Sequence, residues 1–304
     1  MPGLANMLRI MAVSNQDAVS ERYFTYANRG RNQWWLYLAT IAVGLSGGTF
    51  AATLISILLA LFKLLPADIA LQISRPSDPL LFFGAIAVMF ACFLFGIAGA
   101  AALIQKKRPK DIIGCWRWSL FVWGLTAWLI VQSVLAAIDF AIVPSGFHRG
   151  GDLAPSLLIW VFSAILIQTF TEEFIFRGYL TQGIFLALRR PIPSACLSGL
   201  VFGVVHIPNG WPQAINALWF GIVCAYLAIR TGGIALTCGL HLANNYFGAI
   251  GVVSAGDVFK GLPGFLVQNT PQLEWWDLAL AILAMTMAPW AFRKLELLSD
   301  SARG

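Results

Sequence analysis

Charged residues are scarce in this chain: they make up 11% of its 304 residues, whereas 59% are hydrophobic. In a soluble domain about a quarter of the residues are charged, so this composition excludes an ordinary soluble protein. Long uncharged runs recur along the sequence. A helix satisfies its own backbone hydrogen bonds in lipid, so such runs predict membrane-spanning helices. The predicted fold class is an all-α, polytopic transmembrane helical bundle.

Signatures of several other protein classes are absent. The five cysteines form no Cys-x-x-Cys pair and most lie in apolar runs, so we expect reduced packing residues and neither disulfides nor a metal cluster. Residues 1–33 contain no apolar core followed by a cleavage site, so no signal peptide is expected. The net charge of +6 is spread between the apolar runs, which is typical of membrane topology and not of a nucleic-acid-binding surface.

The long apolar runs define eight predicted membrane spans, of which the fifth is short. They cover residues 34–62, 80–104, 118–138, 155–188, 193–207, 212–229, 234–253 and 275–292. They divide the chain into a polar cytoplasmic segment (1–33), three spans without catalytic motifs (34–154), a core that bears polar motifs (155–255), and an outer loop with the last span and a cytoplasmic tail (256–304).

The distribution of lysine and arginine supports eight spans. Alternate loops lie on the same side of the membrane, and cytoplasmic loops carry an excess of basic residues. With eight spans, fifteen basic residues lie on the side of the termini and four on the other side. Omitting the short fifth span would reverse every later loop and remove this asymmetry. We therefore expect an integral, multi-pass protein surrounded by membrane lipids, with its N and C termini cytoplasmic.

Two carboxylates and a guanidinium interrupt the long fourth span. Glu173 and Arg177 are four residues apart, so on a helix they share a face and can neutralise each other. Glu172 points about 100° away from Glu173 and lacks that partner. Charged groups at membrane depth are costly and usually functional, and a carboxylate without a basic partner suits a general base.

Two histidines and an asparagine lie in later spans. His206 ends the fifth span, and His241 and Asn245 are four residues apart in the seventh. Each such residue alone is more often a structural group that joins neighbouring helices. Their joint occurrence is harder to explain in this way, because spans one to three contain no Asp, Glu, Lys, Arg or His. His148 lies in a loop, and we expect it at the surface.

The polar residues fall into three ordered motifs on membrane helices. The motifs are Glu172-Glu173-x-x-x-Arg177, Phe202-x-x-x-His206 and His241-x-x-x-Asn245. In this order they resemble the signature of the CPBP intramembrane proteases, the CAAX prenyl endopeptidase-like family that is also called the type II CAAX protease or Abi family. The likeness covers about residues 155–255.

This resemblance implies hydrolysis of a peptide bond in or near the membrane, in a peptide or a membrane-associated protein. By this likeness Glu172 and His206 activate a water, His241 and Asn245 stabilise the oxyanion, and the ion pair of the fourth span holds the motif helix in place. We expect these groups to meet in one cavity among spans four, five and seven that opens to the cytoplasmic side.

The sequence leaves the role of metal open. Glu172, His206 and His241 are candidate zinc ligands, because two histidines and a glutamate form a plausible set with an open position for water. Zinc would require their donor atoms to converge at about 2.0–2.2 Å from one point. A metal-free glutamate–histidine mechanism is equally consistent with these residues, and no other cofactor is expected.

Other functions fit the motifs less well. Gly44-Leu45-Ser46-Gly47 matches the Gly-x-Ser-Gly of an intramembrane serine protease, but nothing around it is polar, and such small residues suit close helix packing. The His-Glu-x-x-His of a site-2-type metalloprotease is absent. The alternative from another class is a non-catalytic membrane protein of the same fold, either an immunity protein or scaffold, or a proton-coupled transporter.

Overall fold

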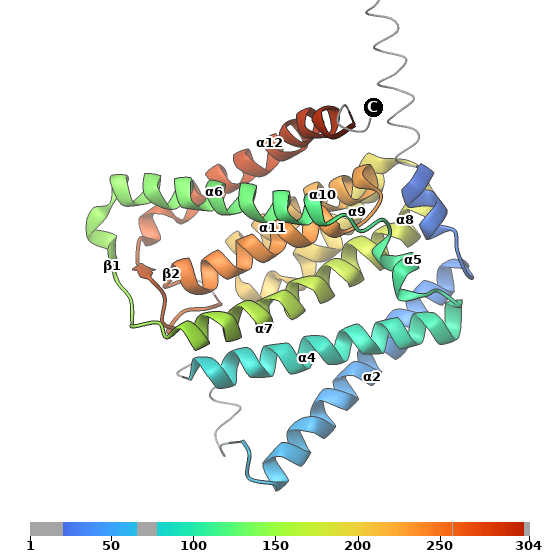
Figure 1. The fold of residues 1–304 in the computed structure, drawn as a ribbon, viewed down its shortest axis with the longest axis horizontal. Helices are drawn as coiled ribbons and strands as arrows, with labels where there is room; N and C mark the ends of the chain where they lie inside the picture. The colour runs from blue at the N-terminus through green and yellow to red at the C-terminus, as the bar shows by residue number, and fades with distance from the viewer. Residues whose placement is uncertain (1–20, 66–77, 257, 301–304) are drawn as a thin grey trace, which may run out of the picture.

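The structure is a computed structural model that describes residues 21–65, 78–256 and 258–300, so parts of the predicted N-terminal segment and tail lie outside the described residues. The described chain is a bundle of helices, and the predicted all-α membrane fold is confirmed (Figure 1). The principal helices are α2 (Trp34–Leu61), α4 (Pro79–Ala100), α6 (Trp118–Ile142), α7 (Pro155–Glu173), α8 (Thr181–Leu188), α9 (Pro191–Val205), α10 (Trp211–Thr231), α11 (Ala235–Tyr246) and α12 (Glu274–Asp300).

Each predicted span corresponds to a helical segment, but two segments are short. Six stretches of the described chain are long and apolar enough to cross a membrane. By contrast, α9 has 15 residues, and α11 has 12 followed by the five-residue π-helix η5 (Phe247–Gly251). A membrane crossing needs about 20 residues, so these two helices are too short to cross unaided. Figure 1 shows α11 in the middle of the bundle, between α6 and α7.

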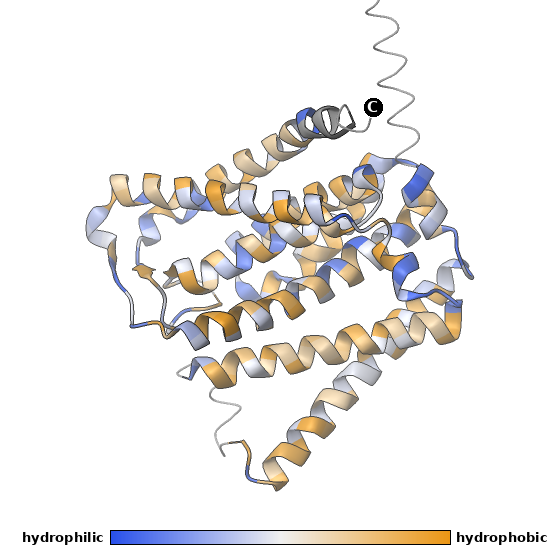
Figure 2. Cartoon of the chain, viewed as in Figure 1, coloured by the Kyte–Doolittle hydropathy of each residue, from blue (hydrophilic) through white to orange (hydrophobic). Residues whose placement is uncertain are grey.

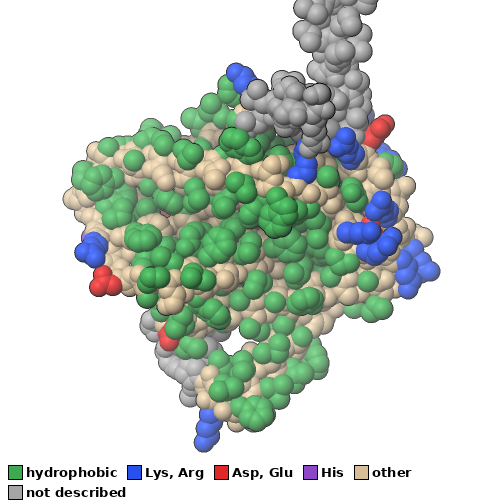
Figure 3. Space-filling model, viewed as in Figure 1, with side chains coloured by type: hydrophobic (Ala, Val, Ile, Leu, Met, Phe, Trp, Pro, Cys, Tyr) green, Lys and Arg blue, Asp and Glu red, His purple; other side chains and the backbone are tan. Residues whose placement is uncertain are grey.

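Many large hydrophobic side chains are exposed on the described helices, in agreement with a multi-pass membrane protein. Figure 2 shows hydrophobic residues along most of α2 and α4, and Figure 3 shows hydrophobic side chains spread over the visible face of the bundle. Lys and Arg side chains gather at one end, near the short helix α5 (Pro109–Ile113). We call this end the basic end. The five cysteines are all free thiols, as predicted.

A small sheet, which the sequence did not predict, lies at the opposite end, which we call the sheet end. Its strands are β1 (Phe147–Arg149), β2 (Val252–Ser254) and β3 (Leu266–Gln268), in the order β1-β3-β2. β3 pairs antiparallel with β1 and parallel with β2. β1 follows α6, β2 follows η5 and β3 precedes α12. The sheet therefore links three connecting segments by hydrogen bonds.

Close glycine contacts allow the central helices to approach one another. A Cβ on Gly221 of α10 would lie 2.8 Å from Cα of Gly199 in α9. A Cβ on Gly239 of α11 would overlap the carbonyl oxygen of Phe121 in α6. Small residues at helix crossings give the contact area that drives helix association in lipid. These crossings fix α9 and α11, which carry two of the three polar motifs.

The fourth span is one continuous helical stretch whose winding changes after the carboxylates. α7 passes directly into the π-helix η3 (Phe174–Leu180) and then into α8. A Cβ on Gly178 would lie 2.8 Å from the carbonyl oxygen of Ile112 in α5. The wider turn therefore brings this stretch against α5, and π-helical turns occur often at functional sites.

Residues 21–33 pack against the basic end and reach the fourth span. The hydroxyl of Tyr23 donates a 2.6 Å hydrogen bond to the carbonyl oxygen of Arg177. Nζ of the buried Lys107 donates to the carbonyl oxygens of Ala27 at 2.6 Å and Arg29 at 2.8 Å. The N-terminal segment is therefore tied to the helix that carries the charged motif.

Candidate active site

Glu173 lies at the centre of the buried polar cluster. Its Oε1 is 3.0 Å from an Nη atom of Arg177 and accepts a 2.8 Å hydrogen bond from Nδ1 of His241. Glu173 and Arg177 are completely buried and His241 is almost so. The sequence predicted the Glu173–Arg177 contact from their spacing. The contact with His241 joins two motifs that are 68 residues apart along the chain.

Aromatic rings surround the Arg177 guanidinium. Its Cζ lies 4.1 Å from the centroid of the Phe202 ring and 5.6 Å from that of Phe220. Its N–H groups form no aligned hydrogen bonds among the described residues, so the 3.0 Å contact with Glu173 is electrostatic. The aromatic faces stabilise the cation in place of water. Phe202 thereby connects the second motif to the first.

Glu172 faces a different set of groups, as the helical spacing predicts. Its Oε1 accepts a 2.7 Å hydrogen bond from Nε2 of Gln168, one turn earlier on α7. Its Oε2 lies 3.4 Å from Nε2 of His241. Our reading of the sequence missed Gln168, although an amide four residues before Glu172 in an apolar run was a signal that could have identified it.

A chain of amides continues from this carboxylate into α11 and α6. Nδ2 of Asn245 donates to Oε1 of Gln168 at 3.0 Å and lies 3.3 Å from Nε2 of His241. Nδ2 of Asn244 in turn donates to Oδ1 of Asn245 at 3.0 Å, and Nε1 of Trp128 donates to Oδ1 of Asn244 at 3.1 Å. These bonds fix the direction in which each amide points, so Asn245 presents its N–H groups to Gln168 and His241.

His206 has a defined tautomer. Its Nδ1 lies 2.7 Å from the carbonyl oxygen of Phe202. A carbonyl only accepts hydrogen bonds, so Nδ1 carries a proton, and in the neutral ring Nε2 is an acceptor. The ring centroid also lies 4.4 Å from that of Phe202, which holds the imidazole in place. His206 therefore has the form that can accept a proton at Nε2.

One cavity of about 370 Å³ connects these groups. Glu172, His206, His241 and Asn245 line it together with Gln168. Glu173 and Arg177 do not line it, and they support His241 from behind. The three spans that we expected to form the cavity, now seen as α7, α9 and α11, all contribute, with α4 and α10 as additional walls. His148 lies in β1 and is exposed.

The direction in which the cavity extends differs from our expectation. We expected it to open towards the end with the basic loops. Its lining instead includes Phe82 near the start of α4, Asn209 between α9 and α10, and Gly248 and Phe259 beyond α11, all in the half of the bundle nearer the sheet. The reason is that α9 ends at Val205 and leaves space beyond its end. The number of residues between a loop and a site residue indicates how deep that residue lies in the membrane, but it does not indicate the direction in which the cavity extends.

The side chains do not form a set of metal ligands. Among the described residues no three His, Cys, Asp or Glu side chains converge closely enough to hold a metal ion. Nδ1 of His241 is bonded to Glu173, and the candidate ligands Glu172, His206 and His241 share a cavity without meeting at one point. The residues as arranged do not fit a zinc ion, and we derive no step through a metal.

Comparison with known proteins agrees with the motifs. The chain is 28% identical over 285 residues to "Uncharacterized protein YyaK" of Bacillus subtilis (strain 168), covering 87% of this chain and 94% of that protein. No solved structure gives a significant match. Residues 154–247 match the family model "Type II CAAX prenyl endopeptidase Rce1-like", and this region contains all three motifs. The resemblance read from the sequence is thereby confirmed: residues 154–247 match the model of the type II CAAX prenyl endopeptidase-like family.

Proposed function

We propose that the protein is an intramembrane endopeptidase that hydrolyses a peptide bond in the cavity lined by Glu172, His206, His241 and Asn245. The observation that carries this proposal is the convergence of side chains from α7, α9 and α11 on one cavity within an apolar bundle. Water-accessible polar groups are costly at this depth and are typical of a functional site. The family of residues 154–247 supports the same reaction class.

Glu172 is the proposed general base. It has no basic residue bonded to it in the way that Arg177 is paired with Glu173, and Gln168 orients its Oε1. Glu172 takes a proton from a water, and the hydroxide attacks the carbonyl carbon of the substrate. Nε2 of His206 is the acceptor atom of a neutral ring and assists in orienting that water. The proton then passes to the amine nitrogen as the C–N bond breaks.

His241 and Asn245 are the proposed oxyanion stabilisers. Nδ2 of Asn245 is a donor that stays in place because Gln168 and Asn244 fix the amide. Nδ1 of His241 is held by Glu173, so the ring presents Nε2 to the cavity, where it donates to the oxyanion when it carries a proton. Donors held in place before charge develops lower the barrier, because they need no reorganisation.

The topology belongs to the same proposal. The basic end is cytoplasmic by the positive-inside rule, so both termini are cytoplasmic. The substrate is a peptide or a membrane-associated protein that reaches the cavity from within the bilayer or from the sheet end. Whether it carries a prenyl group is a question for the assay, in which prenylated and unprenylated peptides are compared.

The test is cleavage by purified protein in lipid nanodiscs of a library of apolar and prenylated peptides, read by mass spectrometry. Wild type cleaves at least one member, and Glu172→Gln and His206→Ala lower the rate by a factor of about 10²–10⁴. His148→Ala, which changes an exposed histidine, is the matched control and keeps the wild-type rate. Rates after chelation and metal analysis of the same sample decide between zinc and a metal-free site.

Two results would overturn the proposal. One is the absence of cleavage of every peptide together with a cell phenotype that survives Glu172→Gln, which would indicate a scaffold or immunity protein. The other is solute flux that follows a pH gradient in proteoliposomes and disappears in Glu172→Gln, which would indicate a proton-coupled transporter.

A further inference from the structure

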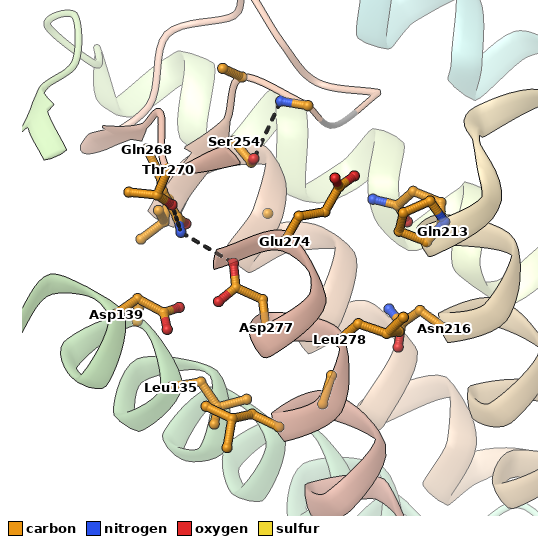
Figure 4. A pocket seen from close by; sticks show the side chains of 18 of the residues that line it. Leu135, Asp139, Gln213, Asn216, Ser254, Gln268, Thr270, Glu274, Asp277 and Leu278 are labelled. Carbon is orange, nitrogen blue, oxygen red and sulfur yellow. Dashed lines mark hydrogen bonds between the residues drawn. The ribbon is translucent and has the colours of Figure 1, made fainter. Parts of the chain in front are cut away.

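A second cavity of about 510 Å³ lies at the sheet end, between α6, α10 and α12 (Figure 4). Its walls are rich in carboxylates and amides. The polar side chains that line it are Gln132, Asp139, Asn209, Gln213, Asn216, Ser254, Gln268, Asn269, Thr270, Glu274 and Asp277. Within the described part of the chain, no lysine, arginine or histidine lines it. Asp139, Glu274 and Asp277 all lie outside the region that matches the family model, so that match says nothing about them.

Asp139 and Asp277 point towards each other at this cavity (Figure 4), and their carboxyl groups are within hydrogen-bonding distance. Asp139 on α6 is 94% buried (6% exposed), and among the described residues Oδ1 of each carboxylate is buried and receives no hydrogen bond from an amide, a hydroxyl or a basic group. Gln268 of β3 positions Asp277 through a 3.4 Å contact between Nε2 and Oδ2. Two ionised carboxylates cannot donate to each other. They must therefore either share a proton or bind a cation that contacts both of them.

The size and chemistry of the cavity favour an organic cation over a metal ion. The described residues include no group of three ligands suited to a metal, and about 510 Å³ is in the range of small-molecule and side-chain pockets, far larger than one ion. A guanidinium or ammonium group carries several N–H donors, and these match carboxylate oxygens together with amide and hydroxyl oxygens. Glu274 also extends into the cavity (Figure 4).

This acidic cavity borders the catalytic cavity. Asn209, Gln213, Asn216 and Gly248 line both of them. Gln213 and Asn216 lie one turn apart on α10, and the next turn of the same helix faces the catalytic cavity with Ala217 and Phe220. One extended peptide along this face of α10 would therefore reach both the acidic pair and Glu172.

We infer that the acidic cavity is a substrate subsite that binds a basic side chain of the peptide cleaved at Glu172. The bound peptide is a substrate only if the proposed function holds, so the inference rests on that function. The binding of a basic side chain is measured without cleavage. Asp139 and Asp277 bind the ammonium or guanidinium group, Glu274 adds negative charge, and the shared α10 face directs the rest of the peptide to the catalytic cavity.

The test uses the full protein in nanodiscs and a fluorescent apolar peptide in which one lysine is moved along the sequence, with glutamine at the same positions as the reference. Binding is measured by anisotropy in Glu172→Gln, which removes the proposed base and prevents turnover. At one register the lysine peptide binds about tenfold to a hundredfold more tightly than its glutamine partner, the range expected for hydrogen bonds to charged groups. In wild type, kcat/KM shows the same preference.

Variants of Asp139 and Asp277 test whether these two residues cause the preference for the lysine peptide. Asp139→Asn and Asp277→Asn, each added to Glu172→Gln, reduce the lysine-to-glutamine ratio to about one. Asp152→Asn is the matched control, because Asp152 is a highly exposed carboxylate at the same end, and it keeps the ratio. Comparing two peptides on the same protein makes the ratio independent of how much of a variant folds.

Several outcomes contradict the inference. Equal binding of lysine and glutamine peptides at all registers would mean that the two carboxyls only share a proton. Loss of all cleavage in the aspartate variants while Glu172→Gln remains active would make the pair a catalytic aspartyl dyad. Competition by free arginine amide without any peptide preference would indicate a site for a small cation. A lysine preference in binding without any cleavage would refute the proposed hydrolysis, and with it the role of the cavity as a substrate subsite, and would leave only a cation-binding site.

Discussion

Gln168 joins two residues of the cavity: it donates a 2.7 Å hydrogen bond to Glu172 and accepts a 3.0 Å bond from Asn245. One side chain thereby orients both the proposed base and a proposed oxyanion donor. We expect Gln168→Ala to lower kcat about tenfold to a hundredfold with little change in KM, because misplaced groups lose rate more than affinity. Gln168→Glu, which loses the amide donor, is equally impaired.

Steady-state kinetics on any peptide cleaved by wild type checks this prediction. Ser163→Ala is the matched control, because Ser163 is an exposed residue on the same helix whose hydroxyl donates to the carbonyl oxygen of Ile159, one turn earlier. A wild-type kcat in Gln168→Ala would refute the positioning role.

The buried Glu173–Arg177 pair is expected to stabilise the fold. Glu173→Gln leaves the fully buried Arg177 cation without its counter-charge, and breaking a buried pair in this way costs about 3–5 kcal/mol of unfolding free energy. The double variant Glu173→Gln/Arg177→Met removes both charges and recovers part of the loss. Thermal unfolding of both variants in nanodiscs is the measurement. A Glu173→Gln melting curve that coincides with that of wild type would show that the pair contributes nothing to stability.

The α6–α11 crossing is sensitive to a single methyl group. A Cβ on Gly239 would overlap the Phe121 carbonyl oxygen, so Gly239→Ala forces the helices apart and lowers the unfolding free energy by about 1–3 kcal/mol. Gly47→Ala on α2 is the matched control, because nothing lies within 4 Å of a Cβ at that position. Equal melting temperatures for the two alanine variants would contradict the crossing geometry.

The buried Lys107 predicts a pH dependence of stability. Burial, opposed by the negative charge of Asp111, lowers the pKa of Lys107 from 10.5 to about 8. Between these two pH values the unfolded chain binds a proton that the folded protein lacks, so this residue makes stability rise with pH from about 8 to 10.5. Wild type should therefore gain stability over Lys107→Met across this window.

Unfolding measured at several pH values tests this slope. Lys110→Met removes an exposed lysine from the same loop region and should follow wild type at each pH. Parallel curves for wild type and Lys107→Met above pH 8 would mean that Lys107 keeps its proton in the folded protein.

The membrane helices could be predicted because their signal is local. Long apolar runs with few charges mark α2, α4, α6, α7, α10 and α12, and their length and hydropathy are sufficient evidence. The helices α9 and α11 carry the weaker signal of short apolar segments, and the asymmetry of basic loops was needed to place α9. The sheet strands have three residues each, too few for any alternation to appear, and their pairing depends on where α6, η5 and α12 end.

The candidate site was predictable to the extent that helical spacing determines contacts. Spacing of four residues predicted that Glu173 meets Arg177, and a 100° step predicted that Glu172 points elsewhere. The contact of Glu173 with His241 depends on how α7 and α11 cross, and no local pattern encodes it. The sequence analysis likewise did not predict that Asp139 and Asp277 lie close together. Each residue lies near the end of its helix, and the two helix ends meet only through the tertiary fold at the sheet end.

The short length of α9 has a consequence for His206. The last carbonyl groups of a helix have no backbone N–H donors, and the hydrocarbon of a bilayer provides no water to donate to them. The backbone N–H of His206 bonds to Gly203, so the carbonyl of Phe202 receives the ring Nδ1 instead. The imidazole therefore acts as the C-terminal cap of α9. An asparagine at this position could close the helix equally well, yet it would offer no nitrogen able to accept a proton.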